Sequence, residues 1–124
     1  MTIADSDVLI ETMRGKEPFA SIVSRRLADG LLVTTSVSTF KLWAGAKSDS
    51  EKERVRKLLA AIEVVPFDES AALQAASARR DLEALGLPIG TADYLIAGVC
   101  LSRGMSLLTN NRKHFERVPG LVLA

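Results

Sequence analysis

Two acidic residues far apart in the chain have the chemistry to hold a metal ion together. Asp5 ends a short apolar segment, and Asp93 begins the otherwise apolar run DYLIAGVCL. Hard cations such as Mg²⁺ or Mn²⁺ bind one or two carboxylates and fill their remaining positions with water and phosphate oxygens. Asp93 alone is explained equally well by the attraction of a carboxylate to a helix N-terminus. Asp5 follows a predicted strand, where we expect no helix dipole of its own, and this favours the metal site.

The elements that must position these acids alternate between strand and helix. Apolar, β-branched runs predict strands, and apolar residues at helical spacing predict helices. Expected strands cover residues 2–5, 31–35, 63–67 and 105–109, with a short edge strand at 121–123; expected helices cover 8–13, 18–29, 37–47, 69–85, 91–102 and 112–115, with one more after residue 50. This alternation predicts a parallel sheet covered on both faces, with ligands bound beyond the carboxyl ends of the strands.

Several polar residues are predicted to begin helices. Ser36 or Ser38 can cap the helix after the second strand, and Ser50 with Glu53 has the spacing of a capping box. Asp68 is the expected cap of the long alanine-rich helix that follows the third strand.

Composition sets wider limits. The chain has 124 residues, the size of one domain, which we take to span residues 1–124. Its longest apolar runs are too short to cross a bilayer, and its N-terminus lacks a signal-peptide pattern, so we expect a cytoplasmic protein without membrane attachment. The net charge is +1. Basic residues gather locally, and such clusters more often form solvated helix faces than a nucleic-acid footprint.

Four segments together resemble those of VapC-type PIN-domain toxins. They read ADSDVLIETMRG, SVSTFKLWAGAKS, LPIGTADYLIAG and LLTNNRKHFERVPGL, and the resemblance covers essentially the whole chain. It implies a PIN-like three-layer α/β/α sandwich with a central, mainly parallel sheet of four to five strands. It also implies a metal-dependent endoribonuclease that uses Mg²⁺ or Mn²⁺.

The resemblance assigns roles to individual residues. Asp5 and Asp93 match the acids that hold the metal, and Asn111 matches an Asp or Asn position that orients water or an acidic neighbour. Ser6 and Thr109 match small hydroxyl residues that support the acidic site. The resemblance leaves the roles of two more residues open. Asp7 could touch the site from its rim, and we interpret His114 as a structural surface residue.

Lys41 departs from the family pattern, in which this position normally carries a Glu of the acidic site. At an effective dielectric of ~20, unit charges ~4 Å apart interact by roughly 4 kcal/mol, so this exchange could cost several kcal/mol of metal affinity. The side chain could also act as a surrogate cation or turn its charge into solvent. The substitution is either natural or was selected because an active toxin harms its host.

The predicted function is therefore that of a ribonuclease toxin in a toxin–antitoxin module, impaired by Lys41. The resemblance implies a homodimer, a VapB-like antitoxin that covers the site, and an RNA substrate, with transfer RNA as one candidate. One alternative is a catalytically inactive PIN-fold protein that acts by binding antitoxin. A remote alternative is a phospho-accepting receiver domain, because Asp5, Asp7 and Asp68 follow predicted strands.

Overall fold

A four-stranded parallel sheet forms the centre of the computed structural model, which describes residues 1–124. The strands have the order β3-β2-β1-β4, and every neighbouring pair is parallel. Their bounds are β1 Thr2–Ala4, β2 Leu32–Thr35, β3 Glu63–Val65 and β4 Ser106–Leu108. The edge strand expected at 121–123 is not formed: this segment makes a single parallel bridge, Leu107 with Leu123. The fifth strand that the family pattern allows is therefore absent.

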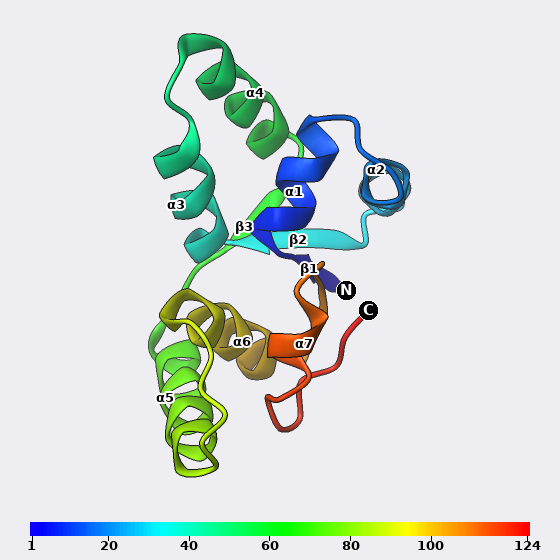
Figure 1. Ribbon diagram of the computed structural model, residues 1–124. Coiled ribbons are helices and arrows are strands. Elements are labelled where there is room, and N and C mark those ends of the chain that lie inside the picture. The colour runs from blue at the N-terminus through cyan, green and yellow to red at the C-terminus, as the bar shows by residue number, and fades with distance from the viewer.

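Helices cover both faces of the sheet and give the expected three-layer α/β/α sandwich (Figure 1). The first four helices lie on one face and form the N-terminal layer: α1 Ser6–Met13, α2 Phe19–Ala28, α3 Ser36–Gly45 and α4 Asp49–Ala60. The last three lie on the other face and form the C-terminal layer: α5 Glu69–Ala84, α6 Thr91–Arg103 and α7 Arg112–Phe115. None of these helices is both long and apolar enough to span a membrane.

Each layer packs its own apolar core against the sheet. Successive strand residues point to opposite faces. Accordingly, Ala4 and Leu108 belong to the core beneath the N-terminal layer, whereas Ile3 and Leu107 belong to the core beneath the C-terminal layer. Both faces of β1 and β2 are buried, which explains why these strands show no alternation of apolar and charged residues, whereas β3 at the edge of the sheet exposes Glu63 and Val64.

Helices α5 and α6 pack closely because of a glycine. A Cβ atom built on Gly98 would lie 2.4 Å from the carbonyl oxygen of Ala71 and 2.8 Å from the Cβ of Ala75. No side chain fits there without moving one helix. This contact holds α6, and with it Asp93, at a defined place against α5.

Two predicted helix caps are wrong, and in each case a neighbouring hydroxyl replaces the expected one. Thr35, rather than Ser36 or Ser38, caps α3, and its Oγ1 accepts a hydrogen bond from the Ser38 amide. Ser48, rather than Ser50, caps α4 by accepting from the Glu51 amide. The hydroxyl of Ser48 in turn donates to the Glu51 carboxylate. The cap predicted at Asp68 is confirmed, since its carboxylate accepts from the Ala71 amide.

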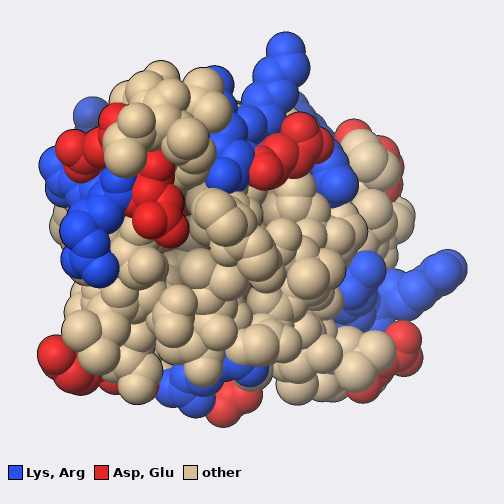
Figure 2. Space-filling model, turned by 90° about the horizontal axis from the view of Figure 1, so that it is seen from below, with Lys and Arg blue, Asp and Glu red and all other residues tan.

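Charged groups do not form a continuous patch on the face seen from below. Figure 2 shows Lys, Arg, Asp and Glu side chains interleaved around the edge of this face, whereas its middle carries none. This face therefore offers no extended basic surface to a polyanion.

Candidate functional site

Asp5 lies at the carboxyl end of β1, the strand between β2 and β4, and is almost completely buried. Only 3% of its surface is exposed. Its Oδ1 accepts a hydrogen bond of 2.7 Å from the Ser6 amide, and Asp5 is the N-cap of α1. The expectation that no helix dipole acts on Asp5 is therefore wrong, because the chain enters α1 directly after the strand. The helix N-terminus helps to accommodate a carboxylate that burial disfavours.

A second hydrogen bond fixes the other oxygen of Asp5. The Thr109 hydroxyl, at the end of β4, donates to Asp5 Oδ2 at 2.8 Å and itself accepts from the Asn111 amide at 3.0 Å. Thr109 thus lies where the sequence placed a supporting hydroxyl. Ser6 is also adjacent to Asp5, but it contributes its backbone amide to the carboxylate.

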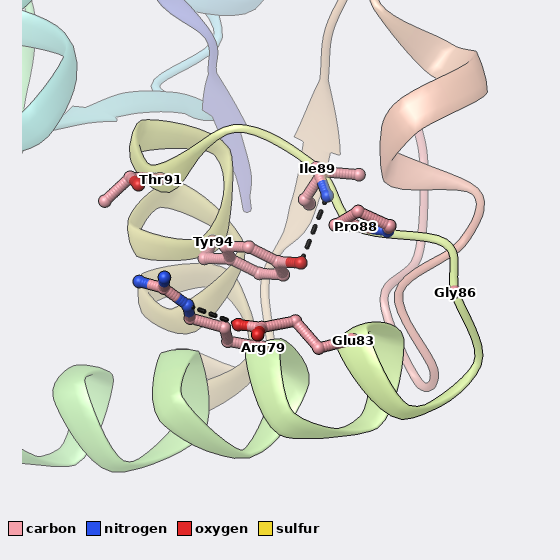
Figure 3. A pocket seen from close by; sticks show the side chains of 7 residues that line it. All are labelled: Arg79, Glu83, Gly86, Pro88, Ile89, Thr91 and Tyr94. Atoms are coloured by element: carbon pink, nitrogen blue, oxygen red, sulfur yellow. Dashed lines mark hydrogen bonds and ion pairs between the residues drawn. The ribbon is translucent and has the colours of Figure 1, made fainter.

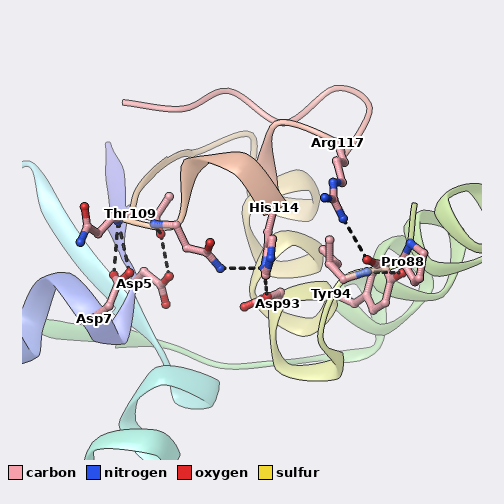
Figure 4. Close-up of polar contacts among 11 residues, drawn as sticks. Asp5, Asp7, Pro88, Asp93, Tyr94, Thr109, His114 and Arg117 are labelled. Atoms are coloured by element: carbon pink, nitrogen blue, oxygen red, sulfur yellow. Dashed lines mark hydrogen bonds and ion pairs between the residues drawn. The ribbon is translucent and has the colours of Figure 1, made fainter. Parts of the chain in front are cut away.

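Asp93, in the first turn of α6, is joined to the same set of residues through His114 (Figure 4). Asn111 Nδ2 lies 2.8 Å from His114 Nδ1, and this ring nitrogen lies 3.4 Å from Asp93 Oδ2. In the neutral ring, Nδ1 can form only one of these two contacts as a hydrogen bond: it accepts from the Asn111 amide when it carries no proton, or it donates to Asp93 when it carries one. His114 is partly exposed on α7, as expected, and it also contacts Asp93, one of the two acids predicted to hold the metal.

The two acids are therefore the ends of one polar network. Polar contacts run from Asp5 through Thr109 and Asn111 to His114 and on to Asp93, whose Oδ2 lies 3.4 Å from His114 Nδ1. Asp5 and Asp93 are also close enough for the charge of Asp93 to contribute to raising the pKa of Asp5, after the larger effect of burial. We refer to Asp5, Asp7 and Asp93 as the acidic site.

Asp7 lies on the rim of this site. Its carboxylate accepts from the Asn110 amide at 3.3 Å. Burial, followed by the negative charge of Asp5, raises the pKa of Asp7 from 3.8 to about 6. An Asp that holds its proton more tightly in the folded state than in the unfolded chain destabilises the fold when it ionises.

We expect this ionisation to appear in the stability of the metal-free protein. The stabilising contribution of protonated Asp7 is fully present below pH 3.8 and is lost as the pH rises through about 6. Partial exposure of Asp7 reduces the size of this effect. As the pH rises from 3.8 through about 6, the free energy of unfolding should fall by about 1–2 kcal/mol more in the native chain than in Asp7→Asn. Urea denaturation at several pH values in EDTA measures the free energy of unfolding of the native chain and of Asp7→Asn. The same pH dependence in Asp7→Asn would contradict this assignment.

Lys41 lies on α3, half-buried, with its charge acting on two of the three acids. Burial raises the pKa of both Asp5 and Asp7, and the positive charge of Lys41 opposes this rise in each. Lys41 nevertheless forms no ion pair within 4.0 Å, since the ion pairs of the chain are those at Arg56, Arg79, Arg103 and His114. Its ammonium group therefore acts through space on the acidic site.

The side chains of the acidic site could supply only a few of the ligands that a hard cation needs. Carboxylate and amide oxygens are suitable ligands, and burial, the main cause of the raised pKa of Asp5 and Asp7, disfavours their charged forms in the absence of a cation. However, no three His, Cys, Asp or Glu side chains converge closely enough to hold an ion. A hard cation such as Mg²⁺ or Mn²⁺ needs only one or two carboxylates when water and phosphate complete its shell.

A hollow of about 420 Å³ beside the first turn of α6 has no free charge to offer a ligand (Figure 3). The Arg79 side chain in its wall is paired with Glu83 at 2.6 Å. The Tyr94 hydroxyl accepts from the Ile89 amide at 3.0 Å and ties the preceding loop to α6. This region supports the helix that carries Asp93.

Comparison with known proteins identifies the family. The model of the PIN domain matches residues 2–121. The chain is 34% identical over 122 residues to the tRNA(fMet)-specific endonuclease VapC of Shigella flexneri, covering 94% of this chain and 91% of that protein. It is 35% identical over 115 residues to ribonuclease VapC10 of Mycobacterium tuberculosis, covering 93% and 86% of the two chains.

Solved structures agree with the fold. The structure of DNA-bound VapBC from Salmonella typhimurium superposes with a TM-score of 0.88 at 28% identity, covering 99% of this chain and 96% of that chain. VapBC2 from Rickettsia felis bound to a promoter DNA fragment gives a TM-score of 0.87 at 20% identity, with the same coverage. Together with the family model and the ribonuclease relatives, these likenesses show that the chain belongs to the PIN domain family and resembles its VapC toxins.

Proposed function

We propose that this chain is a VapC-type endoribonuclease that hydrolyses phosphodiester bonds of RNA with the help of Mg²⁺ or Mn²⁺. The observation that carries the proposal is the polar network that links buried Asp5 to Asp93 at the carboxyl ends of the strands. The relatives of this chain that are named as ribonucleases or endonucleases support this class of reaction. Because a relative is named as specific for tRNA(fMet), transfer RNA is the first substrate to test.

The residues of the network would orient the two ligands. Asp5 is held through both oxygens, by the Ser6 amide and the Thr109 hydroxyl, so its remaining lone pairs have a fixed direction. Asn111 holds His114, which borders Asp93. A bound divalent ion would activate water and neutralise charge that develops on the phosphate. Asp5 and Asp93 would hold this ion, and Lys41 would weaken its binding by repulsion.

The partners follow from the likeness to toxin–antitoxin complexes. Structures named as VapBC from Salmonella typhimurium and Haemophilus influenzae superpose on nearly the whole chain. We infer a VapB-like antitoxin as the partner and cytoplasmic RNA as the target. Two large apolar side chains of α3 are exposed, Phe40 at 70% and Trp43 at 41%, and a homodimer would bury such a face.

The fold argues against a receiver domain. Doubly wound receiver sheets have the order 2-1-3-4-5, so that β1 lies next to β3. Here β1 lies between β2 and β4. Asp68, one of the acids on which that alternative depended, caps α5.

The alternative of an inactive PIN-fold protein that only binds antitoxin rests on Lys41. We expect the chain to cleave transfer RNA slowly in millimolar Mn²⁺ and to lose this activity in EDTA, because two carboxylates remain. Cleavage is followed on denaturing gels, and the mass in solution shows the dimer and the antitoxin complex. A chain that binds antitoxin but cleaves no RNA at any Mn²⁺ concentration would be a binding protein as it stands.

A further inference from the structure

A hollow between α1, α3 and α4 combines an apolar floor with a positively charged rim. Its volume is about 330 Å³. The rim carries Arg14, which follows α1, Lys41 on α3 and Arg54 on α4. The floor is formed by apolar side chains: Ile10, Met13, Leu42, Ala46 and Val55. In Figure 1 these three helices lie together in the N-terminal layer.

The three cations of this rim have no partner within the protein. Neither Arg14, Lys41 nor Arg54 occurs among the ion pairs of the chain, all of which involve other cations. Glu51 is the only acid in the lining. Its carboxylate is already bound by the Ser48 hydroxyl and the Lys47 amide at the start of α4. The hollow therefore presents uncompensated positive charge, in contrast to the hollow of Figure 3, whose Arg79 is paired.

Lys41 connects this hollow with the acidic site. It lines the hollow, and its charge also lowers the pKa of Asp5 and Asp7 against the larger, raising effect of burial. Helix α1 also joins the two places, because it begins at Asp5 and ends in the hollow with Met13 and Arg14, so a ligand in the hollow would lie about two helical turns from the acidic site. An RNA strand cleaved at the acidic site must continue beyond the scissile phosphate, and this hollow is an adjacent place for it.

We propose that the hollow between α1, α3 and α4 is a subsite for a nucleotide near the scissile bond. The inference rests on the proposed function, because it names a further part of the same RNA site. The phosphate would lie on Arg14, Lys41 and Arg54, which form charge-assisted hydrogen bonds to phosphate oxygens. The apolar floor would face the base or sugar. A phosphodiester carries one negative charge, as a carboxylate does, but RNA supplies such a charge at every nucleotide, and a strand held at the acidic site must continue past this rim, so the occupant favoured is RNA.

The test measures RNA binding without cleavage. A short, fluorescein-labelled single-stranded RNA of mixed sequence is titrated in EDTA, and its anisotropy is followed from low to physiological salt. We expect Arg14→Gln and Arg54→Gln each to weaken binding about 3- to 10-fold at low salt. Each should also reduce the slope of log K against log salt by about 0.7, the contribution of one phosphate contact on a single strand.

Arg80→Gln is the matched control. Arg80 is an exposed arginine of α5 in the opposite layer and takes part in no ion pair, so the same change should leave affinity and slope as in the native chain. Circular dichroism and thermal melting confirm that each variant is folded.

Three results would overturn the subsite: no RNA binding by the native chain in EDTA, unchanged binding by folded Arg14→Gln and Arg54→Gln, or a loss no larger than in Arg80→Gln. If these two variants bind RNA normally but bind a synthetic acidic peptide more weakly, the hollow accepts a protein segment instead. Because the assay needs neither metal nor cleavage, its outcome is independent of whether the acidic site is catalytic.

Discussion

Lys41→Glu is expected to raise the affinity of the chain for Mn²⁺ by about 100-fold and to raise its rate of RNA cleavage strongly. The substitution replaces a repelling ammonium group with an attracting carboxylate next to Asp5, one of the proposed ligands. A 100-fold change corresponds to about 2.7 kcal/mol. This lies below the several kcal/mol that Coulomb's law gives for close charges at an effective dielectric of ~20, since Lys41 forms no direct ion pair. Calorimetric titration with Mn²⁺ measures the affinity, and gel electrophoresis measures the cleavage.

Two further variants show whether a higher Mn²⁺ affinity of Lys41→Glu comes from the lost repulsion, from the new carboxylate or from the change in net charge. Lys41→Gln removes the repulsion without supplying a ligand, so its Mn²⁺ affinity should lie between those of the native chain and Lys41→Glu. Lys47→Glu makes the same charge change at an exposed residue beyond the end of α3 and should leave the affinity nearly unchanged. A folded Lys41→Glu protein with unaltered Mn²⁺ affinity and no cleavage would refute the view that this lysine impairs the site.

The second large effect is expected for Asp93→Asn in the Lys41→Glu background. Mn²⁺ affinity and cleavage should each fall by at least about 100-fold, because a neutral amide replaces one of the two carboxylates proposed to hold the ion. Asp93 is the better acid to replace, because Asp5 accepts hydrogen bonds with both oxygens and an amide there would lose one of them. The same titration and cleavage assays apply.

Asp68→Asn provides the matched control for this substitution. It removes the same charge from an acid that caps α5, and Asn is an equally good N-cap. The ion pair of Asp68 with Arg103, which this change also removes, is 3.7 Å long and exposed, so it contributes little to stability. We expect stability, Mn²⁺ affinity and cleavage to be retained in this variant. Activity of the Asp93→Asn protein comparable to that of its parent would show that Asp93 is a helix-terminus residue and not a ligand.

Much of the fold could be predicted because local patterns and packing agree. The apolar strands and the helix ends at Gly30 and Gly86 follow from residue types alone, and both glycines have a positive φ. The caps of α3 and α4 were misplaced because several hydroxyl residues stand within two positions of each other. Only the direction in which the chain enters the helix selects between them. The segment 121–123 has strand composition, but its pairing with β4 stops after a single bridge.

The meeting of Asp5 and Thr109 could be predicted from the sequence, but the contacts that join them to Asp93 could not. Asp5 and Thr109 stand at the ends of neighbouring strands, and a parallel sheet brings such ends together. The contact between His114 and Asp93 depends on how α7 lies against α6, which no local pattern encodes. A signal was nevertheless present: Asn111 and His114 are three residues apart at the start of a helical turn, a spacing that places side chains side by side.

The three-layer architecture means that no single layer contains the whole acidic site. Asp5 and Asp7 move with α1 and the core beneath the N-terminal layer, whereas Asp93 moves with α6, which Gly98 holds against α5. The separation of the proposed ligands therefore depends on how closely α6 packs against the sheet that carries Asp5. A substitution deep in the core between α6 and the sheet, far from any ligand, would alter metal affinity by changing that separation.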